Sequence, residues 1–177
     1  INRGPTVLTS GHNSGGLIAQ SSGGGGGYAG SQTSDDAIGR LGGGTGLLSL
    51  RDSYSLNGGD VSLRNRATVV TEGLQSPGLL AQSIGGGGGF AGRLSTGDIR
   101  FGLHGQATAN SGAISVTNTG SVATMARGSS ALSAQSVAGG GGFASASDSA
   151  GIHRGVRQAG MAKAGSVTVS NSNNLDT

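Results

Sequence analysis

The residues that most often carry chemistry in proteins are few in this chain, and they form no catalytic or metal-binding pattern. The three histidines, His12, His104 and His153, lie at unrelated positions, and no two of them are four residues apart. There is no cysteine, and Asp35-Asp36 is the only adjacent pair of carboxylates. A zinc site, a calcium loop or a nucleophilic triad needs several such groups at set spacings. The sequence therefore predicts a protein that is not an enzyme and uses no metal or cofactor.

Neither the glycines nor the basic charge indicates a phosphate or nucleic-acid site. A phosphate loop needs Gly-Lys-Ser or Gly-Lys-Thr at the start of a helix, and Lys163 is the only lysine. The net charge is +3, but the arginines are spread along the chain and aromatic residues make up only 3% of it. We therefore expect no nucleic-acid partner. Arg64, Arg66 and Arg100 would form a basic stripe suited to weak adhesion to anionic surface polymers.

The strongest pattern is a repeat in which an Ala-Gln-Ser step runs into a block of glycines and then an aromatic residue. Gln82 and Gln135 lie 53 residues apart, whereas Gln20 and Gln82 lie 62 residues apart. A fixed internal period of this length is typical of repeat architectures. The equivalent positions are the glutamines Gln20, Gln82 and Gln135, the central glycines Gly25, Gly87 and Gly140, and the aromatics Tyr28, Phe90 and Phe143.

The same register divides the chain into units. Residues 1–59 form a partial repeat with a longer tail, 60–112 and 113–165 form complete repeats, and 166–177 begin a further one. We therefore expect the chain to be a fragment of a longer array. The extra residues of the first tail are expected in a loop, which is either a plain spacer or part of a binding face.

Short segments within each unit alternate apolar and polar residues, as half-buried strands do. The first strand is predicted at residues 61–64, 114–117 and 167–170. The second is predicted at 6–9, 68–71 and 121–124, and the third at 16–19, 78–81 and 131–134. One further strand or arch is expected in the tails. Because no helical period lies between these segments, the pattern indicates an all-β solenoid.

An asparagine follows the first strand at the same register in three units: Asn65, Asn118 and Asn171. If the units stack, these side chains lie over one another and their amides can hydrogen bond along the stack. Asparagine also tolerates the left-handed backbone of a tight turn. The alternative is that these are turn asparagines that never touch.

The glycine blocks allow two interpretations. Ordering five glycines costs more backbone entropy than ordering other residues, so packing must offset that cost. Extended helices of the polyproline II type, rising about 3.1 Å per residue, could lie side by side and bond through their N–H groups. Alternatively, the blocks are mobile hairpins that project into solvent. The predicted fold is an all-β, β-solenoid or β-helix-like array with units of about 53 residues and protruding or bundled polyglycine II-type segments.

The string Gly78-Leu79-Leu80-Ala81-Gln82-Ser83-Ile84, followed by five glycines, resembles the repeats of autotransporter passenger proteins of Gram-negative bacteria. The third copy departs from this string at Ser133 and Ala138, and the first copy departs from it at Ser22. The resemblance implies export through the outer membrane by a C-terminal β-barrel that this chain does not contain. It also implies an extracellular or cell-surface location. No apolar run in the sequence is long enough to insert into a membrane.

These observations predict a structural segment of a secreted or surface-displayed protein that forms a stalk or fibre. The expected partners are neighbouring repeats or further copies of the same protein, with adhesion to a host or bacterial surface glycan. An alternative is a receptor-binding tip module, like that of a phage tail fibre, on a polyglycine scaffold. A weaker alternative is an ice-binding protein with a flat threonine or glycine face.

Overall fold

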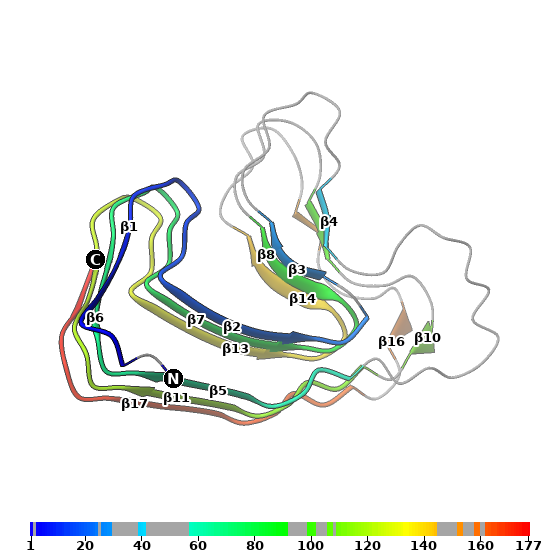
Figure 1. Cartoon of the computed structure of the whole chain (residues 1–177). Helices are drawn as coiled ribbons and strands as arrows, with labels where there is room; N and C mark the ends of the chain where they lie inside the picture. Colours follow the sequence, from blue (N-terminus) through cyan, green and yellow to red (C-terminus); the bar gives the residue numbers. More distant parts are fainter. Residues whose placement is uncertain are drawn as a thin grey trace.

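The computed structural model describes residues 1, 3–24, 26–29, 39–41, 57–91, 99–101, 106–107, 109–144, 152–153, 158–159 and 162–177 (Figure 1). Within these ranges the chain forms strands and turns and no helix. Every pairing between the strands is parallel. The prediction of an all-β fold is therefore confirmed.

Three parallel sheets surround the apolar core, and we name them by their position in Figure 1. The base sheet contains β5 (Val61–Asn65), β11 (Ile114–Asn118) and β17 (Val167–Asn171). The side sheet contains β1 (Thr6–Thr9), β6 (Thr68–Thr71), β12 (Val122–Thr124) and β18 (Leu175–Asp176). The middle sheet contains β2 (Leu17–Ser22), β7 (Leu79–Ile84) and β13 (Leu132–Val137).

The other sheets are built from residues at and beyond the glycine blocks. The glycine sheet contains β3 (Gly26–Ala29), β8 (Gly88–Ala91) and β14 (Gly141–Ala144). A further sheet contains β4 (Gly39–Leu41), β9 (Ile99–Phe101) and β15 (Ile152–His153). The last pair is β10 (Gln106–Ala107) with β16 (Gln158–Ala159). The middle sheet lies between the base sheet and the glycine sheet (Figure 1).

Neighbouring strands come from positions that the sequence period relates. In the base sheet, Val61 pairs with Ile114, and Ile114 pairs with Val167. In the middle sheet, Leu17 pairs with Leu79, which also pairs with Leu132. In these two sheets, the sequence offsets of 53 and 62 residues are therefore the offsets of the strand pairing.

The base sheet and the middle sheet bury their residues differently. Along β5, Val61, Leu63 and Asn65 are buried, whereas Ser62 and Arg64 are exposed. This alternation is that of a strand with one face in water. All six residues of β7 are buried, because the middle sheet is covered on both faces.

The core itself consists of small layers of aliphatic side chains. Apart from Ala131, which directly precedes β13, its buried members come from the base, side and middle sheets and are Val61, Leu63, Val69, Leu79, Ala81, Ile114, Val116 and Val122. Because successive side chains of a strand point to opposite faces, Leu79 and Ala81 face this core while Leu80, Gln82 and Ile84 face the other way. A chain with few large apolar residues can fill such a core because each strand contributes only one or two of them.

We predicted three strands per unit and one further strand or arch in the tail, and this number of strands is too small. The third strand does not end at residue 81 but runs to Ile84, and the described residues from Val61 to Ala107 form β5 to β10. β8 was missed because half of its residues are glycines, which carry no side-chain pattern for a strand prediction to use.

The glycine blocks contact one another, but not as polyglycine II helices. Gly86 and Gly87 have φ angles of 86° and 84°, a left-handed conformation that favours glycine. They form a bend, after which Gly88 and Gly89 enter a parallel β ladder with the other copies. Polyproline II geometry, with φ near −75°, is therefore wrong for these residues. Gly25, the central glycine of the first block, lies outside the described residues.

Close packing explains why the first block position that follows β7 is glycine. A Cβ at Gly85 would overlap the carbonyl oxygens of Ala109 and Asn110. Backbone bonds also join the blocks, since the Gly140 N–H donates to Gly85 O at 2.6 Å and the Gly87 N–H donates to Gly23 O at 2.7 Å. The blocks are thus bonded parts of the fold and not projecting hairpins. Of the aromatic residues after them, Tyr28, Phe90 and Phe143, only the backbone is described, as part of the glycine sheet.

Candidate functional site: hydrogen-bonded ladders between equivalent strands

The asparagines that end the base-sheet strands form an asparagine ladder. Asn65 Nδ2 donates to Asn118 Oδ1 at 2.8 Å, and Asn118 Nδ2 donates to Asn171 Oδ1 at 2.7 Å. The structure thus brings together the three residues that share a register in the sequence. The side chains of Asn65 and Asn118 are fully buried, whereas Asn171, the last member of the ladder, is exposed.

Each asparagine of the ladder also closes the turn that follows it. Asn65 Nδ2 donates to Ala67 O at 2.8 Å, while the Ala67 N–H donates to Asn65 Oδ1 at 3.2 Å. Asn118 Nδ2 donates in the same way to Gly120 O at 2.8 Å. A short amide side chain can reach the backbone two residues ahead, and this bond satisfies a turn carbonyl that would otherwise be buried without a partner.

A glutamine ladder runs through the middle sheet. Gln20 Nε2 donates to Gln82 Oε1 at 2.6 Å, and Gln82 Nε2 donates to Gln135 Oε1 at 2.9 Å. Gln82 is completely buried on the face of the middle sheet opposite the aliphatic core. In contrast to the asparagines, these side chains bond to one another and not to the backbone of a turn.

The two ladders have the same direction. In both, the amide nitrogen donates to the equivalent residue that comes later in the chain. Because all the amides have the same orientation, each donor between two members of a ladder meets an acceptor. A buried amide group without a hydrogen-bond partner would cost about 1–3 kcal/mol of stability. The stack of strands is therefore polar, with donors directed toward its C-terminal end.

The serine after each glutamine joins the middle sheet to the segment that precedes a base-sheet strand. Ser83 Oγ donates to Gly59 O at 2.8 Å and accepts from the Gly112 N–H at 2.7 Å. Ser136 Oγ repeats this arrangement between Gly112 O at 2.9 Å and the Gly165 N–H at 2.9 Å. This role was not predicted from the sequence, although a serine stands at the same place in three copies.

A second set of hydroxyl groups supports the turn after the side sheet. Thr71 Oγ1 donates to Ser76 O at 2.7 Å, and the Ser76 N–H donates to Ser129 Oγ at 2.9 Å. The Ser14 N–H donates in turn to Ser76 Oγ at 2.9 Å. These hydroxyl groups were also missed, because serine and threonine in a turn are expected to bond locally and not between distant copies.

The structure describes only some of the histidine, lysine and aspartate residues that were considered for a catalytic, metal or phosphate site. His12 Nδ1 accepts a hydrogen bond from the backbone N–H of Leu74 at 3.2 Å. Lys163 is joined to the preceding unit through its backbone N–H, which donates to Asn110 Oδ1 at 2.8 Å. His153 is described only as backbone in β15, while Asp35-Asp36 and His104 lie outside the described residues. Within the described ranges, no group of three or more His, Cys, Asp or Glu residues could hold a metal ion.

The three arginines of the expected basic stripe lie on two different sheets. Arg64 and Arg66 are exposed at the end of the base-sheet strand β5. Arg100 belongs to β9, which pairs with β4 and β15 and not with β5. Its side chain is outside the description, so the stripe stays a prediction.

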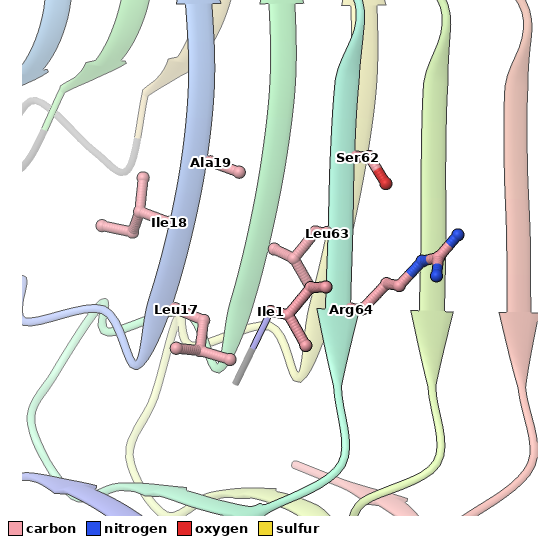
Figure 2. Close-up of a pocket in the computed structure, with 7 residues that line it drawn as sticks. All are labelled: Ile1, Leu17, Ile18, Ala19, Ser62, Leu63 and Arg64. Atoms are coloured by element: carbon pink, nitrogen blue, oxygen red, sulfur yellow. The ribbon is translucent and has the colours of Figure 1, made fainter. Parts of the chain in front are cut away.

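A cavity of about 310 Å³ opens at the edge where β5 and β2 have no further strand beside them (Figure 2). Ile1 lies in this opening next to Leu63 (Figure 2). Both apolar and polar residues line the cavity, namely Ile1, Leu17, Ile18, Ala19, Ser62, Leu63 and Arg64. It is the uncovered end of the core between the base and middle sheets.

No family model, curated protein or solved structure matches the chain. None of the described segments is a helix of the length and hydrophobicity that a membrane span needs. What the chain does must therefore be argued from its ladders, its sheets and their edges.

Proposed function

We propose that this chain is a structural repeat segment of a secreted or surface-displayed bacterial protein, in which a β-solenoid with units of about 53 residues builds a stalk or fibre. The observation that carries the proposal is the stacking of equivalent strands in register, with continuous amide ladders through them. The resemblance of the glycine repeats to autotransporter passengers supports the surface location.

The distribution of the described contacts supports a structural role. In repeat proteins, stability comes from each unit and from its contact with the next unit. Here the Asn–Asn, Gln–Gln and Ser76–Ser129 bonds join residues that are equivalent in neighbouring units, and the bonds of Ser83 and Ser136 join the middle sheet to the segments before the base-sheet strands. The buried polar side chains are thus used to hold one unit on the next.

One outward position of the base sheet differs between copies, while the inward positions hold aliphatic residues and the asparagine of the ladder. Arg64 pairs with Thr117, which pairs with Ser170, whereas inward Val61 pairs with Ile114. Such a surface can change without disturbing the stack, as a stalk that carries varied outer loops would require.

Antibodies raised against the chain would test the location on the source bacterium. We expect them to label intact cells, and labelling only after the cells are permeabilised would overturn the proposal. Electron microscopy of a protein that contains many of these units should in addition show rods with a spacing of about 4.8 Å along their axis. Saturable binding to one glycan on an array, with no rods, would favour a receptor-binding module instead, and thermal hysteresis would favour ice binding.

A further inference from the structure

The segment just before the base-sheet strand β5 contains the only Asn-Gly pair of the sequence, Asn57-Gly58. In such a pair the backbone nitrogen of the glycine can attack the side-chain carbon of the asparagine, because glycine has no Cβ to hinder the approach. We propose that Asn57 is a site of spontaneous covalent modification. The native contact with Asn110 holds the site unreacted, and the isoaspartyl product prevents that contact from forming again.

The modification needs only the chain and water. Gly58 N gives up its proton and forms a bond to Asn57 Cγ, while the Cγ–Nδ2 bond breaks and the nitrogen leaves with that proton as ammonia. Water then opens the resulting succinimide ring at one of its carbonyl carbons. Attack at Cγ restores the ordinary backbone with an aspartate. Attack at the backbone carbonyl carbon leaves the main chain running through Cγ, as an isoaspartate with one additional backbone carbon.

Both reacting groups of the pair are bonded to one residue of the next unit. The Asn110 N–H donates to Asn57 Oδ1 at 2.9 Å, and the Gly58 N–H donates to Asn110 O at 2.8 Å. The attacking nitrogen thus keeps its proton in a hydrogen bond, and the side chain that it must reach is held against the neighbouring unit. Because these bonds must break before the ring can close, the reaction requires the two units to separate locally.

The next copy has the same bonds without the reactive sequence. Asn110 Oδ1 accepts from the Lys163 N–H at 2.8 Å, and the Ser111 N–H donates to Lys163 O at 3.1 Å. Here a serine follows the asparagine, and its side chain hinders ring closure. Asn110 is therefore a control for Asn57 within the same chain.

The isoaspartyl product does not fit the native packing. Gly58 is buried, and a Cβ at this position would lie 2.7 Å from Ile84 O and 2.8 Å from Ser83 Oγ. The following carbonyl oxygen, Gly59 O, accepts a hydrogen bond from Ser83 Oγ at 2.8 Å. An additional backbone carbon would displace both glycines, so the bonds to Asn110 and to Ser83 could not be kept together.

The aspartyl product, in contrast, keeps the backbone and an acceptor. The same chain shows that a carboxylate can hold this kind of contact, since Asp60 Oδ1 accepts from the Ala113 N–H of the next unit at 2.7 Å. The loss of the contact therefore follows from isomerisation of the backbone and not from the new charge.

Incubation of the full chain at mildly alkaline pH, folded and in urea, tests the protection. Peptide mass spectrometry would follow conversion at Asn57 and at Asn110. In urea we expect Asn57 to convert faster than Asn110. In the folded chain we expect Asn57 to convert at least about tenfold more slowly than in urea, because two hydrogen bonds must first break.

Two results would overturn the proposal. Conversion of Asn57 at the same rate in the folded chain and in urea would show that the contact with Asn110 does not protect it. Conversion in urea that is no faster than that of Asn110 would show that Asn57 is not a preferred site.

Hydrogen exchange tests the consequence for the fold. Chains with isoaspartate at this position, separated by chromatography and returned to buffer, should exchange the Asn110 amide proton at least about tenfold faster than the untreated chain. Asn57→Asp is the matched control and should keep this protection. An isoaspartyl chain that protects the Asn110 amide as well as Asn57→Asp does would contradict the inference. The labelling of cells is independent of these results, so failure here would leave the proposed function standing.

Discussion

The asparagine ladder and the glutamine ladder run in the same direction, but their side chains have different second partners. Asn118 bonds to asparagines on both sides and also to the carbonyl oxygen of Gly120. Gln82 bonds only to the glutamines on both sides. The asparagine therefore holds a turn as well as a stack, whereas the glutamine holds only the stack. We expect stability to depend more on the side chains that satisfy buried backbone groups.

The largest effect is expected for Asn118→Leu. This change breaks two links of the asparagine ladder and leaves the Gly120 carbonyl oxygen buried without its partner. Unsatisfied buried groups of this kind lower the free energy of unfolding by about 3 kcal/mol in total. Urea denaturation followed by circular dichroism would measure it. A loss below that of Gln82→Leu would contradict the difference between the two ladders.

A smaller loss, of about 2 kcal/mol, is expected for Ser83→Ala. The hydroxyl of Ser83 is buried and bonds to two backbone groups, Gly59 O and the Gly112 N–H. Its removal leaves both groups without this partner while adding no bulk. Ser115→Ala, on the exposed face of β11, is the control and should change the unfolding midpoint little.

Gln82→Leu should cost less again, about 1 kcal/mol. The leucine replaces the buried amide with an apolar side chain of similar size, and no backbone group loses a partner. Gln20 and Gln135 each lose one bond, but both are only partly buried, so water can replace it. A loss larger than that of Ser83→Ala in the same urea titration would show that the glutamine ladder contributes more than the backbone bonds.

The smallest effect is expected for Arg64→Ala, because Arg64 is an outward residue of β5. Replacing an exposed side chain that is away from the core and from buried hydrogen bonds usually changes the free energy of unfolding by no more than about 0.5 kcal/mol. Thermal unfolding would check this result. A large loss would mean that the outward face of the base sheet takes part in the fold.

Much of the fold follows from the sequence where side chains alternate or repeat. The period related Val61 to Ile114 and Asn65 to Asn118, and the structure pairs them. The glycine sheet could not be predicted in the same way, because glycine has no side chain whose polarity would show which face of a strand is buried. The bends at Gly86 and Gly87 depend on positive φ angles, and sequence alone does not distinguish these from an extended glycine run.

The candidate site was predictable only in part for a similar reason. Identical amides at equal spacing indicate stacking, since amide side chains can pair with copies of themselves. The role of Ser83 depends on how closely the middle sheet approaches Gly59 and Gly112, which are 24 and 29 residues away in the chain. That approach is set by the packing of two sheets and not by the local sequence.

The parallel pairing of all described strands has a consequence for folding kinetics. Paired residues are at least 52 positions apart, as with Gln106 and Gln158. When strands pair only with strands far away in the sequence, long loops must close before any hydrogen-bonded ladder can form. Such a high contact order slows folding. The first pair of equivalent strands is therefore the slow event. Each later segment meets a finished edge, so we expect folding to proceed by templated growth along the chain.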